Sequence, residues 1–93
     1  MIVISEYFDG AVKSLGYDSN DGKSTIGVIE KGEYKFGTSM HETMIILEGE
    51  LEALLPKSAK WETFTNGQSF EVPANQSFTV RTGMQTSYLC KYK

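Results

Sequence analysis

Hydrophobic and polar residues alternate along most of this chain with the two-residue period of β-strands. Nine glycines and repeated clusters of Asn, Asp and Ser interrupt the chain so often that no segment suits a long amphipathic helix. The pattern predicts an all-β chain of short strands, at residues 12–17, 25–29, 33–38, 42–47, 50–55, 61–64, 69–72, 76–81 and 86–92.

The same alternation predicts which side chains point into the interior. In residues 33–38, Glu33 and Lys35 face outward and the even positions face inward. The expected interior is rich in rings and hydroxyls: Tyr34, Phe36, Thr38, Phe78, Val80, Tyr88, Cys90 and Tyr92. Residues 44–47 are apolar on both faces, as in a strand covered by a second sheet or by another subunit. We therefore expect a barrel or sandwich that forms a homodimer.

The size and composition narrow the class of protein. A chain of 93 residues can bury one core but not two, so we expect a single domain over residues 1–93. The net charge of −3 comes from interspersed residues of both signs, which disfavours nucleic acid as a partner. Cys90 has no second cysteine to pair with, and no apolar run approaches the length of a membrane span. We expect a cytoplasmic protein with no membrane partner.

Two stretches have glycine, proline and acidic residues at the spacing of the cupin superfamily. The first places Gly32, Glu42 and Gly49 at motif positions, and the second places Gly67 and Pro73. This resemblance implies a single cupin-type antiparallel jelly-roll barrel with its ligand site in the mouth.

The three histidine positions of those motifs hold other residues, namely Thr38, Met40 and Phe78. A transition metal needs three or four imidazole or carboxylate donors that converge on one point. Glu42 cannot hold one alone, and the single histidine, His41, points to the opposite face of a strand from its neighbour Glu42. We therefore expect no metal and no cofactor.

The whole chain resembles a narrower group, the pyrimidine/purine nucleoside phosphorylase family of small bacterial cupins. Family members have arginine where this chain has Lys91. The resemblance is carried by short sequence motifs and single residues: Glu6-Tyr7-Phe8, Val12-Lys13-Ser14, Gly32-Glu33-Tyr34, Glu42, Met44, Leu54-Leu55-Pro56, Phe70-x-Val72-Pro73 and the C-terminal run from Thr86 to Tyr92.

The resemblance implies a pentosyltransferase of broad specificity. Inorganic phosphate would displace the base of a purine or pyrimidine nucleoside, giving free base and α-D-ribose 1-phosphate without metal or organic cofactor. The alternative is a non-catalytic, metal-free cupin that binds a small nucleoside or sugar metabolite. Dependence of base release on phosphate separates these two hypotheses.

Phosphate binding requires cationic or hydrogen-bonding side chains. Arg81 is the first candidate, because a guanidinium can make a two-pronged contact with phosphate near the end of its strand. Lys13 and Lys91 are further candidates. Simple alternation points Arg81 outward, however, so a surface pairing of Arg81 with a carboxylate is the competing interpretation.

Glu42 is the strongest candidate for the sugar, because a carboxylate can hold ribose hydroxyls or shield the positive charge that develops at the anomeric carbon. The competing interpretation is a buried structural acid. Thr38 and Ser87 offer small hydroxyls for ribose or phosphate. Stacking faces, phenol donors and an apolar contact for the base are expected from Tyr34, Phe36, Phe78, Tyr88 and Met44, unless these residues are plain core.

Overall fold

The computed structural model describes residues 1–92, which form antiparallel strands and no helix. The strands form a six-stranded sheet in the order β1-β2-β3-β10-β5-β8 and a four-stranded sheet in the order β4-β9-β6-β7. Their bounds are β1 (Val3–Tyr7), β2 (Val12–Ser19), β3 (Gly22–Ile29), β4 (Gly32–Gly37), β5 (Glu42–Glu48), β6 (Glu50–Leu54), β7 (Trp61–Thr65), β8 (Ser69–Val72), β9 (Ser77–Thr82) and β10 (Thr86–Tyr92).

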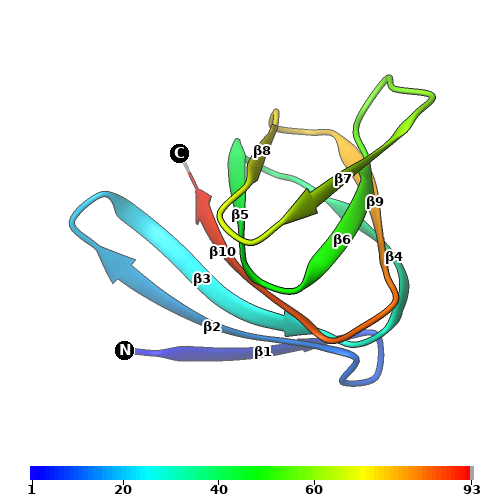
Figure 1. The fold of residues 1–93 in the computed structure, drawn as a ribbon. Coiled ribbons are helices and arrows are strands. Elements are labelled where there is room, and N and C mark those ends of the chain that lie inside the picture. The colour runs from blue at the N-terminus through cyan, green and yellow to red at the C-terminus, as the bar shows by residue number, and fades with distance from the viewer. Residues whose placement is uncertain (93) are drawn as a thin grey trace.

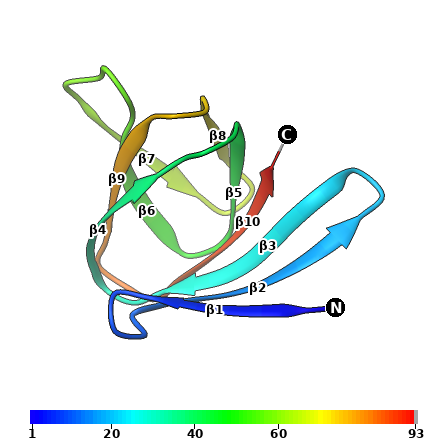
Figure 2. The same ribbon diagram turned by 180° about the vertical axis from the view of Figure 1, so that it is seen from behind.

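The two sheets curve toward each other and enclose the core, while β1, β2 and the far end of β3 extend to one side (Figure 1). The view from behind shows that β4 and β9 close the opposite wall (Figure 2). Among residues 1–92 there is no helix long and apolar enough to cross a membrane.

All nine expected strands are present, and the all-β antiparallel class is confirmed. Strand β1 was not expected from the sequence. It pairs with β2 alone, and four of its five residues are exposed, so its apolar positions do not follow the alternation of a half-buried strand.

The expected inward-facing residues do pack between the sheets. Six of them are buried and the other two, Phe36 and Tyr92, are partly buried. Strand β5, which was expected to be covered on both faces, buries Met44 and Ile46 but leaves Leu47 43% exposed. Within residues 1–92, therefore, one face of β5 is covered, whereas on the other face Ile45 is partly buried and Leu47 is exposed.

Candidate active site

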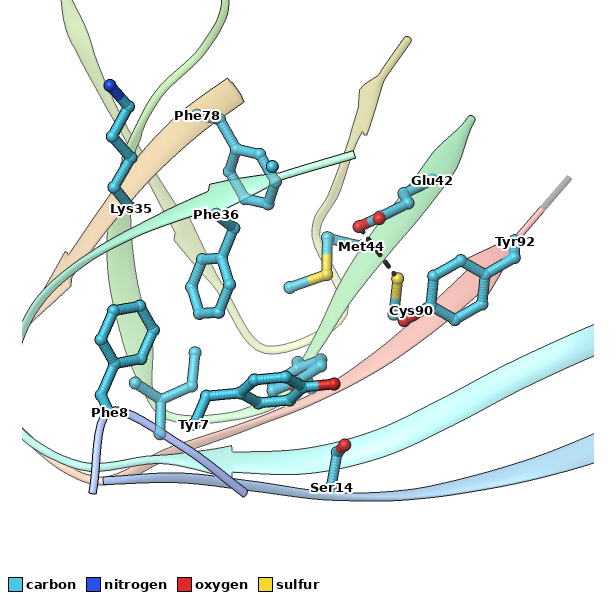
Figure 3. Close-up of a pocket in the computed structure, with 13 residues that line it drawn as sticks. Tyr7, Phe8, Ser14, Lys35, Phe36, Glu42, Met44, Phe78, Cys90 and Tyr92 are labelled. Atoms are coloured by element: carbon cyan, nitrogen blue, oxygen red, sulfur yellow. Dashed lines mark hydrogen bonds between the residues drawn. The ribbon is translucent and has the colours of Figure 1, made fainter. Parts of the chain in front are cut away.

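A cavity of about 410 Å³ opens between the two sheets, and its size falls within the range of about 300 to 1,000 Å³ typical of small-molecule sites. Its lining comes from the turn after β1 and from strands β1, β2, β3, β4, β5, β9 and β10 (Figure 3). Six aromatic rings surround the space: Tyr7, Phe8, Phe36, Phe78, Tyr88 and Tyr92.

Glu42 is the acid of this cavity. It begins β5 and shares the inward face of that strand with Met44. Burial raises the pKa of the Glu42 carboxyl above its ordinary value, although the Cys90 thiol and nearby His41 act in the opposite direction. The Glu42 Oε1 atom accepts a hydrogen bond from Cys90 Sγ over 3.5 Å (Figure 3). The site thus holds one partly desolvated carboxylate whose position depends on a thiol donor.

Cys90 is a hydrogen-bond donor in this arrangement rather than a nucleophile. Its side chain is buried on β10 beside Tyr92. Burial and the charge of Glu42 raise the pKa of the Cys90 thiol to about 12. The thiol therefore remains protonated at neutral pH and keeps its hydrogen available for Glu42.

Neutral hydroxyls complete the cavity floor. Burial raises the pKa of Tyr88 to about 12, and Ser14 beside it only partly offsets this effect. Burial also raises the pKa of Tyr92, whose hydroxyl lies 3.4 Å from the Thr25 Oγ1 atom. The phenols of Tyr88 and Tyr92 therefore stay protonated and can donate hydrogen bonds to a ligand.

The structure brings five of the expected substrate-contacting residues together, because one cavity is lined by Phe36, Glu42, Met44, Phe78 and Tyr88. Three others lie outside its lining and have hydrogen bonds to the backbone. The Tyr34 hydroxyl donates to the Glu30 and Lys31 carbonyls at 3.1 and 3.2 Å.

Thr38 and Ser87 are the other two. The Thr38 hydroxyl donates to the Pro73 carbonyl over 2.7 Å and accepts from the Gln76 amide over 3.0 Å, so it joins two loops. The Ser87 hydroxyl donates to the Glu48 carbonyl over 3.5 Å. Their proposed contacts with substrate therefore remain predictions, and the structure gives these hydroxyls local partners instead.

The three cations expected at phosphate also lie outside this cavity. Arg81 Nε donates to Glu52 Oε1 over 3.0 Å, and its guanidinium lies 3.9 Å from the ring centre of Trp61. Because Phe78 and Val80 face inward, Arg81 on the same strand faces outward. This is the surface pairing that the sequence offered as the competing interpretation.

Lys13 and Lys91 show the same outward orientation on the six-stranded sheet. Lys13 Nζ lies 3.9 Å from Glu6 Oε1, and Lys91 Nζ lies 3.6 Å from Asp21 Oδ2. The phosphate-binding role predicted for these lysines and for Arg81 gains no support from their positions.

Several cavity residues escaped the sequence analysis. Lys35 was expected to face outward, yet it lines the edge of the cavity. Its amine nevertheless points away from the cavity (Figure 3). Ser14 follows Val12 on the inward face of β2, so alternation could have identified it. Tyr7 and Phe8 had no such signal, because they belong to a strand and a turn that the pattern did not predict.

The positions that hold histidines in metal-binding cupins contribute no ligands here. The Thr38 hydroxyl is engaged with the backbone, and the Phe78 ring is part of the core. His41 Nε2 lies 3.0 Å from Glu71 Oε1 and does not line the cavity. Over residues 1–92, no group of three or more His, Cys, Asp or Glu side chains is placed to hold a metal ion.

Comparison with known proteins gives a consistent result over the full chain. Residues 3–92 match the family model described as pyrimidine/purine nucleoside phosphorylase. A protein of that name from Pseudomonas savastanoi pv. phaseolicola is 48% identical over 93 residues, covering all of both chains. Another, from Marinobacter nauticus, is 51% identical over 92 residues and 99% of each chain.

Solved structures give the same fold. A protein of unknown function from Vibrio parahaemolyticus superimposes with a TM-score of 0.96 at 39% identity, over 100% of this chain and 99% of that one. An RmlC-like cupin from Shewanella frigidimarina superimposes with a TM-score of 0.77 at 19% identity, over 99% and 83%. The expected cupin fold is confirmed.

Gly27 gives a first prediction. A Cβ atom at this position would lie 2.5 Å from the Tyr88 ring, so Gly27→Ala must displace that buried phenol. We expect a loss of ~1–3 kcal/mol in unfolding free energy, measured by chemical denaturation. Gly83→Ala is the control, because within residues 1–92 the added carbon meets no heavy atom within 4 Å apart from its own chain neighbours. Equal stability of the two variants would contradict the packing described for Tyr88.

Glu42 gives a second prediction. Its pKa is raised from 4.5 in the folded state, so above pH 4.5 the native protein binds more protons than the unfolded chain. The contribution of Glu42 to unfolding free energy is therefore full below pH 4.5 and is lost as pH rises through the folded pKa. Chemical denaturation of wild type and Glu42→Gln at a series of pH values should show that the unfolding free energy of the variant rises relative to that of wild type as pH rises. The exposed Glu48→Gln should run parallel to wild type, and a parallel curve for Glu42→Gln would refute the assignment.

Proposed function

Because the chain belongs to the pyrimidine/purine nucleoside phosphorylase family, we propose that it catalyses the phosphorolysis of purine and pyrimidine nucleosides. The products are the free base and α-D-ribose 1-phosphate, which makes the enzyme a pentosyltransferase. The observation that supports this proposal is the aromatic cavity of about 410 Å³ with a partly buried carboxylate, Glu42, inside it.

The reaction exchanges one bond at the anomeric carbon for another. The bond from C1′ to the base nitrogen breaks and its electron pair leaves with the base, while a phosphate oxygen supplies the pair for the new C1′–O bond. Positive charge develops on the ribose in between. The ionised Glu42 carboxylate stabilises this charge and accepts hydrogen bonds from ribose hydroxyls, and Cys90 keeps the carboxylate in place.

The base leaves as an electron-rich group, so a nearby hydrogen-bond donor favours its departure. The protonated phenols of Tyr88 and Tyr92 supply such donors. The rest of the wall consists largely of aromatic faces, and stacking on a ring discriminates little between purines and pyrimidines. The lining thus suits a broad range of bases.

Phosphate is the less obvious ligand, because Lys35 is the one cation among the described cavity residues and its amine points away from the space. We place the phosphate against the hydroxyls of Ser14 and Tyr7, which lie in the cavity below Glu42 in the view of Figure 3. Hydroxyl donors hold phosphate oxygens without the ion pair that Arg81 would form.

The direct test incubates chelator-treated protein with a panel of nucleosides, with and without phosphate, and measures free base and ribose 1-phosphate. We expect phosphate-dependent release that survives chelation. Glu42→Gln should lower kcat/KM about 10²- to 10³-fold, because the neutral amide cannot offset the developing charge. Glu48→Gln, the same change on the exposed end of β5, should retain wild-type activity.

Two outcomes would overturn this proposal. Wild-type turnover in Glu42→Gln would remove the catalytic role of Glu42. A nucleoside that raises the melting temperature of the protein but is never cleaved would favour the non-catalytic binding protein instead.

We also propose that the enzyme is a homodimer joined through the outer face of the six-stranded sheet. Strand register aligns an apolar row across five neighbouring strands: Ile4, Leu15, Ile26, Leu89 and Ile45. Ile4, Leu15 and Ile26 are 74%, 47% and 41% exposed. A contiguous apolar surface of this kind on a small protein marks an interaction site.

The size of this face suits a second copy of the chain. Its longest strands, β2 and β3, have eight residues each, which span ~26 Å, and six strands spaced ~4.8 Å apart span ~24 Å. The flat area of the face is therefore ~600 Å², and the side chains that stand out from it add to its accessible surface. This approaches the ~800 Å² that each partner contributes to a standard interface. The same face on both copies gives the self-complementary contact of a two-fold dimer.

Light scattering after size exclusion tests this assembly. Wild type should have the mass of two chains, and Ile26→Glu should have the mass of one, because it places a charge in the centre of the apolar row. Thr63→Glu, on an exposed position of β7 in the other sheet, should remain dimeric. A wild-type monomer, or a dimeric Ile26→Glu, would contradict the proposed interface.

A further inference from the structure

The turn between β1 and β2 has an unusual backbone. Three successive residues, Phe8, Asp9 and Gly10, have positive φ angles of 54°, 57° and 87°. The turn is closed by hydrogen bonds from Gly10 N to the Tyr7 carbonyl and from Ala11 N to the Phe8 carbonyl. Glycine adopts this region freely and aspartate does so at moderate cost, but a bulky aromatic residue such as Phe8 is rarely found there.

This conformation places the Phe8 ring at the mouth of the cavity. The ring centre of Phe8 lies 5.0 Å from that of Tyr34 and 5.5 Å from that of Phe36, which it meets edge to face. Phe36 in turn stacks on Phe78 at 5.7 Å, so aromatic rings continue from the mouth into the interior. Phe8 is nevertheless 46% exposed, so much of its surface is uncovered in the free protein.

The position of Phe8 relative to Glu42 suits contact between this ring and the base of a bound nucleoside. Phe8 and Glu42 lie on opposite sides of the cavity (Figure 3). A nucleoside whose ribose contacts Glu42 has room to extend its flat base across the cavity, toward the side where Phe8 and Phe36 stand. Stacking on an aromatic face tolerates every base, which matches the breadth of the proposed reaction.

We propose that Phe8 is the residue on which the nucleobase stacks at the cavity mouth, and that the strained turn exists to hold its ring there. This inference rests on the proposed phosphorolysis of nucleosides. Backbone strain at a bulky residue persists where it serves a site, and here the strained residue supplies exposed aromatic surface to the cavity. The competing explanation is that Phe8 only packs against Tyr34 to stabilise the turn.

Replacement by glycine separates the two explanations. Phe8→Gly removes the ring and relieves the positive-φ strain at the same time. If the ring serves the base, the dissociation constant of the folded variant for inosine and for uridine, measured calorimetrically without phosphate and well below its melting temperature, should rise roughly tenfold or more. The KM for phosphate should change little.

Matched variants complete the experiment. Asp9→Gly relieves the same kind of strain at the next residue, which does not line the cavity, and should leave nucleoside affinity unchanged. Phe8→Tyr keeps an aromatic face and should retain wild-type affinity, whereas Phe8→Leu keeps apolar bulk without a face and should bind nucleosides more weakly.

The inference is overturned if Phe8→Gly keeps wild-type affinity for inosine and uridine, or if it melts lower with no change in affinity. It is equally overturned if Phe8→Leu binds as tightly as Phe8→Tyr. Failure of the proposed function has a different signature. A wild-type protein that binds nucleosides through Phe8 but never cleaves them would refute phosphorolysis and uphold the stacking role.

Discussion

The pairing of β10 between β3 and β5 is the constraint on which the site depends. Because β10 has a neighbour on each side, its register is set by two ladders of hydrogen bonds, and its alternate residues Tyr88, Cys90 and Tyr92 must face the cavity. On one side, Gly27 of β3 leaves room for the Tyr88 ring. On the other, β5 brings Glu42 to Cys90. One central strand thus positions the phenols and, through the thiol, the carboxylate.

The electrostatic character of the cavity follows from this packing. Burial keeps Tyr88 and Cys90 protonated and raises the pKa of Glu42, so the carboxylate is the principal charge inside a lining that otherwise donates hydrogen bonds or offers aromatic faces. Such an environment suits the nucleoside of the proposed reaction, which is neutral in its ground state and becomes positive at one carbon as the base leaves. The same partial desolvation that raises the free energy of the Glu42 carboxylate strengthens its attraction to that developing charge.

Much of the site could be predicted where a residue's role depends on the face of its strand. Alternation in residues 33–38, 76–81 and 86–92 correctly placed the inward rings. Glu42 was chosen because it is the one acid of the first cupin motif that remains where the histidines are absent, and it does line the cavity. The phosphate-binding role predicted for Arg81 gained no support, because alternation already points this side chain away from the interior. Arg81 was chosen for the chemistry of its guanidinium, but Glu52 on the adjacent strand β6 and Trp61 on β7 hold it outside. No local pattern could reveal those partners, because they lie far away in the sequence.

By itself, the sequence determined the fold class, the inward-facing residues and the resemblance to a family, since a two-residue period and characteristic turns are local properties of the chain. The tertiary structure alone decided which inward residues meet in one cavity and which find partners in the backbone, as Thr38 and Tyr34 do. It also revealed β1 and the turn that carries Phe8, because an edge strand exposed on both faces leaves no alternating pattern to read. The distances between side chains on different strands are set only when strands far apart in the sequence pair, and the chemistry of the cavity depends on those distances.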